Sequence, residues 1–353
     1  MHPTHKYAED VLNGQVVACK WVQLACERHL TDLDRDSVYF DEKEANKVIN
    51  FFPEYLRHSK GEWANRPFHL APWQEFIVGS LFGWKNKETR YRRFRIAYEE
   101  VARKNGKTTM IAGIGNFLFL ADKEPGAEVY TAATKKDQAA LSHSESVRMV
   151  KKSPKLRNRV GIYRNNMSID STASKYQPLG ADADTVDGLN IHGGLIDELH
   201  AHKTRDMWDV LETATGSRRQ PLQMAITTAG VDQTGICYEQ HEYVQQILKR
   251  TIEDDSYFGI IYTLDLNKDC PNIKKEDEDD WTNEEVWIKA NPNLGFSAKL
   301  DDLQRKAKKA KIIPAAQNNF LRKHMDVWTQ QVDRWIDLDL WDQNNAGGIY
   351  VYQ

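Results

Sequence analysis

Residues 101–109, Val-Ala-Arg-Lys-Asn-Gly-Lys-Thr-Thr, constrain the fold of this chain more than any other stretch. The run 94–98 before them predicts the end of a β-strand, and residues 109–121 after them are compatible with a helix. A strand, a tight loop and a helix that opens on Gly-Lys-Thr form a phosphate-binding loop. Backbone amides and the positive end of the helix dipole face the phosphates there. The first glycine of the usual loop is missing, because Val101 occupies its position.

The loop residues have distinct expected roles. Lys107 is expected to reach the β- and γ-phosphates of ATP, and the Thr108 hydroxyl to hold Mg²⁺. Hydrolysis also needs a cation on the transferring phosphoryl group. Arg103, acting within its own subunit, is favoured for this role, whereas Arg218 and Arg219 are alternatives that serve their own site or a neighbour's. The other loop residues expected to contact the nucleotide are Lys104, Asn105, Gly106 and Thr109.

A second element, residues 193–198, supplies the acidic groups that such a loop requires. Its first four residues are typical of a buried parallel strand, and Asp197 and Glu198 follow them. Ligands bind at the carboxyl ends of strands in open α/β sheets. Asp197 is expected to orient the Mg²⁺ shell, and Glu198 to polarise the water that attacks the γ-phosphate. The loop and the acidic strand together predict an ATPase.

Strands and helices alternate around these two elements. A strand is expected at residues 128–133, a helix at 135–152 and another strand at 222–226. Such alternation predicts an α/β fold in which a parallel sheet has helices on both faces. Thr227 and Thr228 follow the last of these strands. Their hydroxyls are candidates to hydrogen-bond a phosphate-bound water.

Ahead of the loop, the apolar positions have helical spacing. They predict one amphipathic helix over residues 7–33 and another over 42–55. The carboxamide of Gln74 can donate to and accept from the adenine edge, and Trp73 can stack on the adenine face. An alternative interpretation of the same segment is a helix that starts at Pro72 and buries Trp73.

Composition restricts the partners and the compartment. The net charge is −3, so any contact with DNA must come from a local patch, such as the basic helix expected over residues 303–312. The four cysteines show neither a CxxC pair nor metal-ligand spacing, which favours reduced thiols. No apolar run is long enough to span a membrane. These features predict a soluble, cytoplasmic protein.

In combination, the motifs resemble those of the large terminase subunit of tailed bacteriophages, the ATPase that drives DNA into the procapsid. The resemblance extends over about residues 7–345. It rests on segments 26–30, 70–74, 102–109, 195–198, 226–230 and 289–292. The deviant loop is usual in this family, and Arg103 occupies the position of the family's loop arginine. The resemblance implies an ASCE-type P-loop core that uses ATP and Mg²⁺.

The resemblance also implies a division of the chain and a set of partners. The division is an N-terminal helical lead (1–60), the P-loop ATPase core (61–245), a small α-rich linker or lid subdomain (246–330) and the start of a nuclease domain (331–353). The implied partners are double-stranded DNA, the portal protein of the procapsid, a small terminase subunit and further copies of the chain in a ring. The implied place is the cytoplasm of the bacterial host.

The C-terminal stretch departs from the family pattern. The family carries an RNase H-like nuclease whose first strand bears a metal-binding Asp. Residues 347–352 stand where that strand is expected, and no acidic residue follows them. We therefore expect the nuclease half to be absent and the chain not to cut DNA. Two alternatives stay open: a helicase or recombination ATPase on the same fold, and an inactive prophage remnant that binds nucleotide or DNA.

Overall fold

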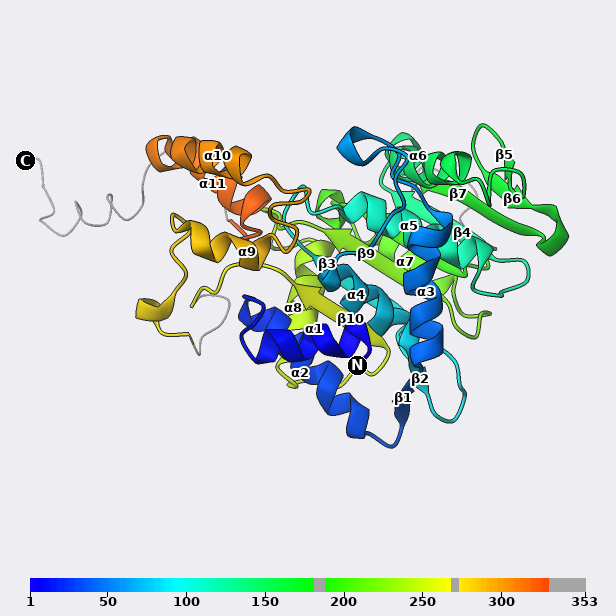
Figure 1. Cartoon of the computed structure of the whole chain (residues 1–353), viewed down its shortest axis with the longest axis horizontal. Helices are drawn as coiled ribbons and strands as arrows, with labels where there is room; N and C mark the ends of the chain where they lie inside the picture. Colours follow the sequence, from blue (N-terminus) through cyan, green and yellow to red (C-terminus); the bar gives the residue numbers. More distant parts are fainter. Residues whose placement is uncertain (181–187, 268–272, 330–353) are drawn as a thin grey trace, which may run out of the picture.

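The computed structural model describes residues 1–180, 188–267 and 273–329 (Figure 1). Within these residues an eight-stranded sheet has the order β10-β3-β9-β8-β4-β7-β6-β5. The strands from β10 to β7 are parallel, and β6 and β5 are antiparallel at one edge. The strands are β3 (Ile96–Glu100), β4 (Glu128–Ala133), β5 (Gly161–Ile162), β6 (Met167–Ile169), β7 (Ser174–Gly180), β8 (Gly193–Asp197), β9 (Leu222–Thr227) and β10 (Tyr257–Ile261). The predicted α/β fold is confirmed, and among the described strands of this sheet the antiparallel edge of β6 and β5 departs from a wholly parallel arrangement.

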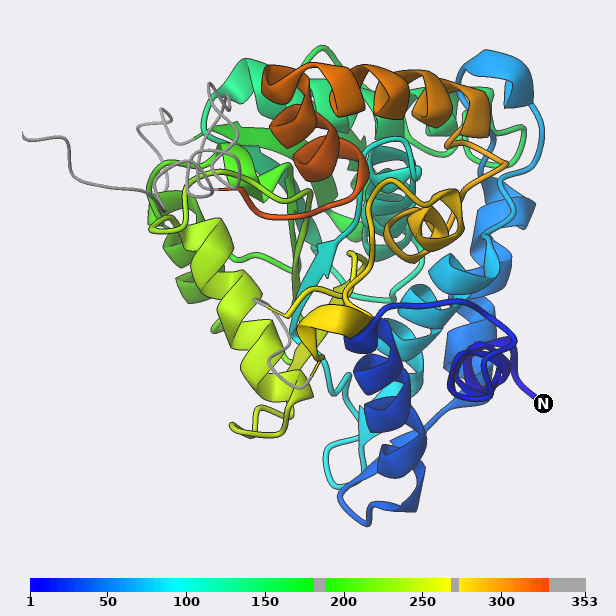
Figure 2. The same ribbon diagram turned by 90° about the vertical axis from the view of Figure 1, so that its left-hand side faces the viewer.

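Helices cover both faces of the sheet (Figure 2). The α-helices of the described residues are α1 (Pro3–Leu12), α2 (Lys20–Thr31), α3 (Glu42–Tyr55), α4 (Pro72–Gly83), α5 (Lys107–Leu120), α6 (Lys136–Lys152), α7 (Asp206–Thr213), α8 (Ile236–Leu248), α9 (Trp287–Ala290), α10 (Leu300–Ile312) and α11 (Pro314–His324). The last three of these helices lie apart from the two faces of the sheet (Figure 1). A Cβ on Gly193 would stand 2.8 Å from Leu118 of α5, and one on Gly194 would stand 3.2 Å from Leu211 of α7. Successive strand residues point to opposite faces, so these two glycines let helices approach β8 from both sides.

The N-terminal helices share the core of the sheet. Tyr7 of α1 and Trp21 of α2 are buried in the same hydrophobic cluster as the central strands. The single helix expected over residues 7–33 is wrong, because the chain forms α1 and α2 with a break between them. Gly14 in the break has a φ of +72°, which a residue with a side chain rarely adopts. The second expected helix, over residues 42–55, is α3. A separate ribbon of β1 (Val38–Phe40) and β2 (Trp84–Asn86) lies beside these helices.

A second hydrophobic cluster lies within residues 264–327. Leu303, Ala307 and Ala310 of α10 point into it, and Trp287 and Phe320 come from α9 and α11. The basic helix expected over residues 303–312 is therefore amphipathic, with its lysines on the outer face. We call the described part of residues 264–329 the second module. Across the described ranges of the chain, none of the helices is long and apolar enough to cross a membrane.

Two histidines and a tryptophan form a row between α1, α2 and β2, in which His29 and Trp84 are buried and His5 is half-buried. The Trp84 indole N–H donates to His29 Nδ1 at 2.9 Å, and His29 Nε2 lies 2.8 Å from His5 Nδ1. An indole N–H can only donate, so His29 Nδ1 accepts, and this requires a neutral imidazole. Burial lowers the pKa of His29 well below its ordinary value, and the charge of the neighbouring His5 lowers it further.

We expect the free energy of unfolding to fall between pH 7 and pH 5, in part through His29. The unfolded chain binds a proton at His29 near pH 6.5 and the folded chain does not, so each pH unit below that value removes up to about 1.4 kcal/mol. Urea unfolding at several pH values measures the loss. His29→Gln should lose less stability than the parent, and His69→Gln, at an exposed position, is the control. Equal losses in His29→Gln and the parent would contradict this assignment.

Candidate nucleotide-binding site

The carboxyl ends of three adjacent parallel strands bring the predicted site residues together. β9 lies between β3 and β8, with Glu100 opposite Thr227 and Asp197 opposite Ile226. The loop 101–106 leaves β3 and enters α5 at its first residue. The predicted phosphate-binding loop therefore lies at the carboxyl end of the sheet, together with the acidic end of β8 and the hydroxyl-bearing end of β9 (Figure 1).

The loop has the backbone of a tight cradle. Lys104 and Gly106 both have a positive φ, 74° and 88°, and Gly106 precedes the first residue of α5. A positive φ at Lys104 is uncommon for a residue with a side chain. The Lys107 ammonium donates to the carbonyl oxygens of Val101 at 3.0 Å and Ala102 at 3.3 Å. The positive charge therefore lies inside the loop, beside the amino end of α5.

Thr108 and Asp197 lie in direct contact. The Thr108 hydroxyl donates to Asp197 Oδ2 at 2.8 Å, and Ser142 of α6 donates to the same oxygen at 3.0 Å. Asp197 Oδ1 is buried and has no hydrogen-bond partner among the described residues. Burial, and then the nearby Glu198, raises the pKa of Asp197. A hydroxyl beside a carboxylate oxygen that is free to ligate suits Mg²⁺, which prefers oxygen ligands, so these residues fit a magnesium ion.

Glu198 and the two threonines meet through His200. Glu198 has a left-handed backbone, with a φ of 62°, and its Oε2 lies 3.2 Å from His200 Nδ1. The His200 amide donates to Thr227 Oγ1 at 3.0 Å, and the ring nitrogen lies 3.1 Å from that oxygen and 3.4 Å from Thr228 Oγ1. Burial lowers the pKa of His200, which favours the neutral ring. Sequence reasoning missed His200, as it missed Ser142, because neither residue stands in a recognised spacing pattern.

A further carboxyl group, that of Glu99, lies near the carboxyl end of β3. Its side chain is fully buried, and neither carboxylate oxygen has a hydrogen-bond partner in the described part of the chain. Burial raises the pKa of Glu99 to about 8, while Lys107 opposes the rise. The neutral acid is therefore the main form at pH 7. The residue lies between the predicted strand end (94–98) and the predicted loop (101–109), and no sequence pattern predicted a role for it.

The three candidate arginines lie at two opposite ends of the parallel strands. Arg218 donates to Glu124 Oε1 at 2.8 Å, and Arg219 donates to the Tyr91 hydroxyl at 2.7 Å. Both precede β9, so they lie at its amino end, away from the candidate site. Arg103 is in the loop, and its Nε is buried without a hydrogen-bond partner among the described residues. Of the three, Arg103 is the one positioned at the site of its own subunit.

The two expected adenine contacts differ in their surroundings. Trp73 is 2 % exposed, so its ring faces are covered, and its N–H points to Asn293 Oδ1 at 3.5 Å. Gln74 Nε2 lies beside the loop, since a Cβ on Gly106 would stand 3.6 Å from it. α4 begins at Pro72 and buries Trp73, as the alternative interpretation of this segment predicts. The geometry thus leaves Gln74 beside the loop and makes Trp73 part of the packing.

The second module contacts the loop directly. Asn105 Nδ2 donates to Asn291 Oδ1 at 3.1 Å, and its Oδ1 accepts the backbone N–H of Asn293 at 3.0 Å. The backbone N–H of Arg103 donates to the carbonyl oxygen of Lys323 at 2.9 Å. The loop conformation is therefore determined by the strand that precedes it and also by side chains and carbonyl groups of the second module.

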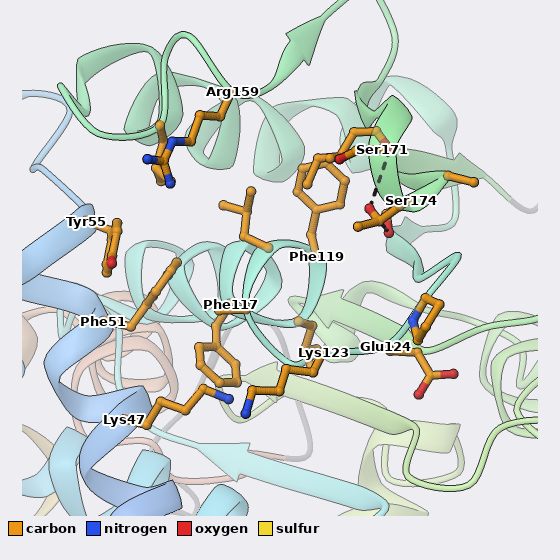
Figure 3. A pocket seen from close by; sticks show the side chains of 18 of the residues that line it. Lys47, Phe51, Tyr55, Phe117, Phe119, Lys123, Glu124, Arg159, Ser171 and Ser174 are labelled. Atoms are coloured by element: carbon orange, nitrogen blue, oxygen red, sulfur yellow. Dashed lines mark hydrogen bonds between the residues drawn. The ribbon is translucent and has the colours of Figure 1, made fainter.

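A large cavity lies elsewhere in the fold. Its volume is about 1290 Å³, and residues of α3 and of the carboxyl end of α5 line it (Figure 3). Phe51 and Tyr55 stack against each other on one side, and Phe117 lies nearby. α5 is 14 residues long and begins at Lys107. The cavity and the loop are thus separated by the length of this helix, about 20 Å.

Two family models match the chain. That of the terminase large subunit ATPase domain matches residues 72–246, and that of the terminase large subunit endonuclease domain matches residues 251–351. The expectation that the nuclease half is absent is therefore wrong. It came from residues 347–352, which lie outside the described residues, whereas the endonuclease match begins at residue 251 and includes the second module.

Two curated relatives match parts of the chain. Protein YmfN of Escherichia coli (strain K12) is 36% identical over 155 residues, 44% of this chain and 32% of that protein. The large terminase subunit of Enterobacteria phage HK97 is 25% identical over 301 residues, 84% of this chain and 55% of that protein. The chain spans from about a third to about half the length of these relatives.

The fold has a counterpart among solved structures. The crystal structure of the HK97 bacteriophage large terminase superposes with a TM-score of 0.66 at 23% identity, over 84% of this chain and 58% of that one. At this identity the likeness concerns the fold. The two matching family models describe domains of the same subunit and together span most of the chain. The chain therefore belongs to the terminase large subunit family.

Proposed function

We propose that this chain is the ATP-hydrolysing motor of a viral terminase, which translocates double-stranded DNA into a procapsid. The main support is that Lys107, Thr108, Asp197 and Glu198 meet at one edge of the sheet. Each supplies a group that phosphoryl transfer from ATP needs: a cation, a pair of metal-binding oxygens and a base. The match to the ATPase domain of the family covers all four residues.

ATP would bind with its phosphates in the loop. Lys107 would exchange the carbonyl oxygens of Val101 and Ala102 for the β- and γ-phosphates, and the amides at the start of α5 would face the same groups. Mg²⁺, when bound, neutralises phosphate charge, and Thr108 and Asp197 would hold it. The Gln74 carboxamide, which lies beside the loop, would receive the adenine edge.

Glu198 would act as the general base. Its Oε2 is buried and lies 3.2 Å from His200 Nδ1 without the geometry of a hydrogen bond. This oxygen would accept a proton from water as that water attacks the γ-phosphorus. The bond between that phosphorus and the bridging oxygen breaks, and ADP leaves. Arg103 would stabilise the charge on the transferring group. Thr227 and His200 would hold Glu198 in place, because they connect its strand end to the neighbouring strand.

The wider assembly is proposed from the family. We propose that the chain works as a homo-oligomeric ring on the portal protein of a procapsid, with a small terminase subunit as partner, in the cytoplasm of a bacterial host. Double-stranded DNA would contact a basic surface. The lysines on the outer face of α10, such as Lys308 and Lys309, are exposed and suit phosphate contacts.

Two substitutions test the hydrolysis mechanism. Lys107→Ala should abolish nucleotide binding or turnover, because it removes the cation that reaches the β- and γ-phosphates. Glu198→Gln should keep ATP binding while steady-state turnover falls by at least about 10²-fold, the scale of general-base catalysis. Glu88→Gln, at an exposed position outside the site, is the matched control. If Glu198→Gln released phosphate at the parent's rate, the water-activating role would be incorrect.

A mixing experiment tests the arginine. Arg103→Ala should lower turnover by about 10³- to 10⁵-fold, the contribution of an arginine finger. We expect a mixture of Arg103→Ala and Lys107→Ala subunits to stay inactive, because each type lacks a group that its own site needs. Recovery of ATPase activity in the mixture would show that an arginine acts between subunits and would overturn the assignment within one subunit.

A further inference from the structure

The segment Met325–Trp328 of the second module lies against the carboxyl ends of the strands that carry the candidate site. Asp326 is buried, and its Oδ1 accepts the backbone N–H of Ala229 at 2.8 Å. Its carbonyl oxygen accepts the Thr263 hydroxyl at 2.8 Å. Asp326 also has a left-handed backbone, with a φ of 55°. A residue with a side chain persists in that conformation only where surrounding contacts determine it, as they do here.

Trp328 fixes the other end of the segment. Its indole N–H donates to Glu100 Oε1 at 3.1 Å, and its ring meets Tyr238 at 4.9 Å between centroids. Gly230 lies under the ring, where a Cβ would stand 2.9 Å from a ring carbon. The segment is therefore held by the ends of two strands, β3 through Glu100 and β9 through the residues that follow it.

The residue that Asp326 holds is one step from the site. Ala229 follows Thr227 and Thr228, whose hydroxyls lie within 3.4 Å of His200 Nδ1. That nitrogen lies 3.2 Å from Glu198. A displacement of the backbone at residue 229 would therefore move the threonines, and with them the histidine that lies beside the carboxylate.

We propose that Asp326 is a positioning residue for ATP hydrolysis, through which the second module sets the geometry of the water-activating carboxylate. Asp326 reaches Glu198 through Ala229, the two threonines and His200, and does not contact the nucleotide. The inference rests on the proposed ATPase function and deepens it, because it makes turnover depend on how the second module docks. Misplacement of a catalytic group by about 1 Å lowers rates by about 10²-fold.

Asparagine is the matched conservative variant. Burial, and then the Glu100 carboxylate, raises the pKa of Asp326 well above its ordinary value, so the neutral acid is favoured. Asparagine resembles the neutral acid in shape and keeps an oxygen that accepts the Ala229 N–H. Alanine removes that acceptor and leaves the amide buried without a partner.

The first test separates turnover from binding. Asp326→Ala should lower kcat for ATP by about 10- to 100-fold, while the KM for ATP and the Kd for Mg²⁺·ATPγS stay within about threefold of the parent. Asp326→Asn should restore kcat to within about threefold. Full activity in Asp326→Ala, or an equal loss in both variants, would overturn the positioning role. Gly230→Ala should reproduce the kcat loss independently, since its methyl group would push the Trp328 ring away.

The second test does not need turnover. Amide hydrogen exchange of the nucleotide-free full chain should be faster over residues 226–230 in Asp326→Ala and unchanged in Asp326→Asn. If the parent released no phosphate from ATP, the proposed function would fail. The exchange result would still test the link between Asp326 and the residues that follow β9. Unchanged exchange in a folded Asp326→Ala protein would refute that link even in an active ATPase.

Discussion

The parallel register of β3, β9 and β8 is the constraint on which the candidate site depends. It places Glu100 opposite Thr227 and Asp197 opposite Ile226. The start of the loop, the two carboxylates and the two threonine hydroxyls therefore lie together at the carboxyl ends of these strands. Because side chains alternate between faces, a shift of one residue would turn Asp197 away from Thr108. The register is held by burial, since every residue of β8 and β9 is buried and each large apolar side chain contributes about 1.5–3 kcal/mol.

The carboxyl ends of these strands carry both buried polar groups that have hydrogen-bond partners and buried polar atoms that have none. Glu100 is satisfied, with the Tyr98 hydroxyl, the Trp328 indole and the His241 ring around its carboxylate. One carboxylate oxygen of each of two acidic residues, Asp197 Oδ1 and Glu198 Oε2, has no hydrogen-bond partner among the described residues. Leaving such atoms unpaired costs about 1–3 kcal/mol each, and perturbed carboxyl groups of this kind cluster at functional sites. The satisfied group connects the second module to the sheet, while the unsatisfied ones belong to the residues proposed to act on ATP and Mg²⁺.

Local patterns were enough to predict part of this arrangement. Lys107 and Asp197 were found because a loop before a helix and carboxylates after an apolar strand each have a recognisable spacing. Ser142 and Asp326 were missed, because their roles depend on where α6 and the second module pack, which no short stretch encodes. For Trp73 the sequence leaves two interpretations open, stacking on adenine and burial in a helix, and tertiary packing covers its ring. The expected absence of the nuclease half failed for a related reason: it relied on one short C-terminal segment, whereas the family match spans 101 residues.

A crystal structure of the chain with Mg²⁺ and ATPγS is the most direct test of the central claim. The Lys107 ammonium should leave the carbonyl oxygens of Val101 and Ala102 and contact the β- and γ-phosphates. The Thr108 hydroxyl should turn from Asp197 to the metal ion, and the Asp326 contact to Ala229 should persist. A nucleotide bound elsewhere, for example in the cavity at the far end of α5, with Lys107 still bonded to its own loop, would contradict the assignment of this sheet edge as the site of ATP hydrolysis.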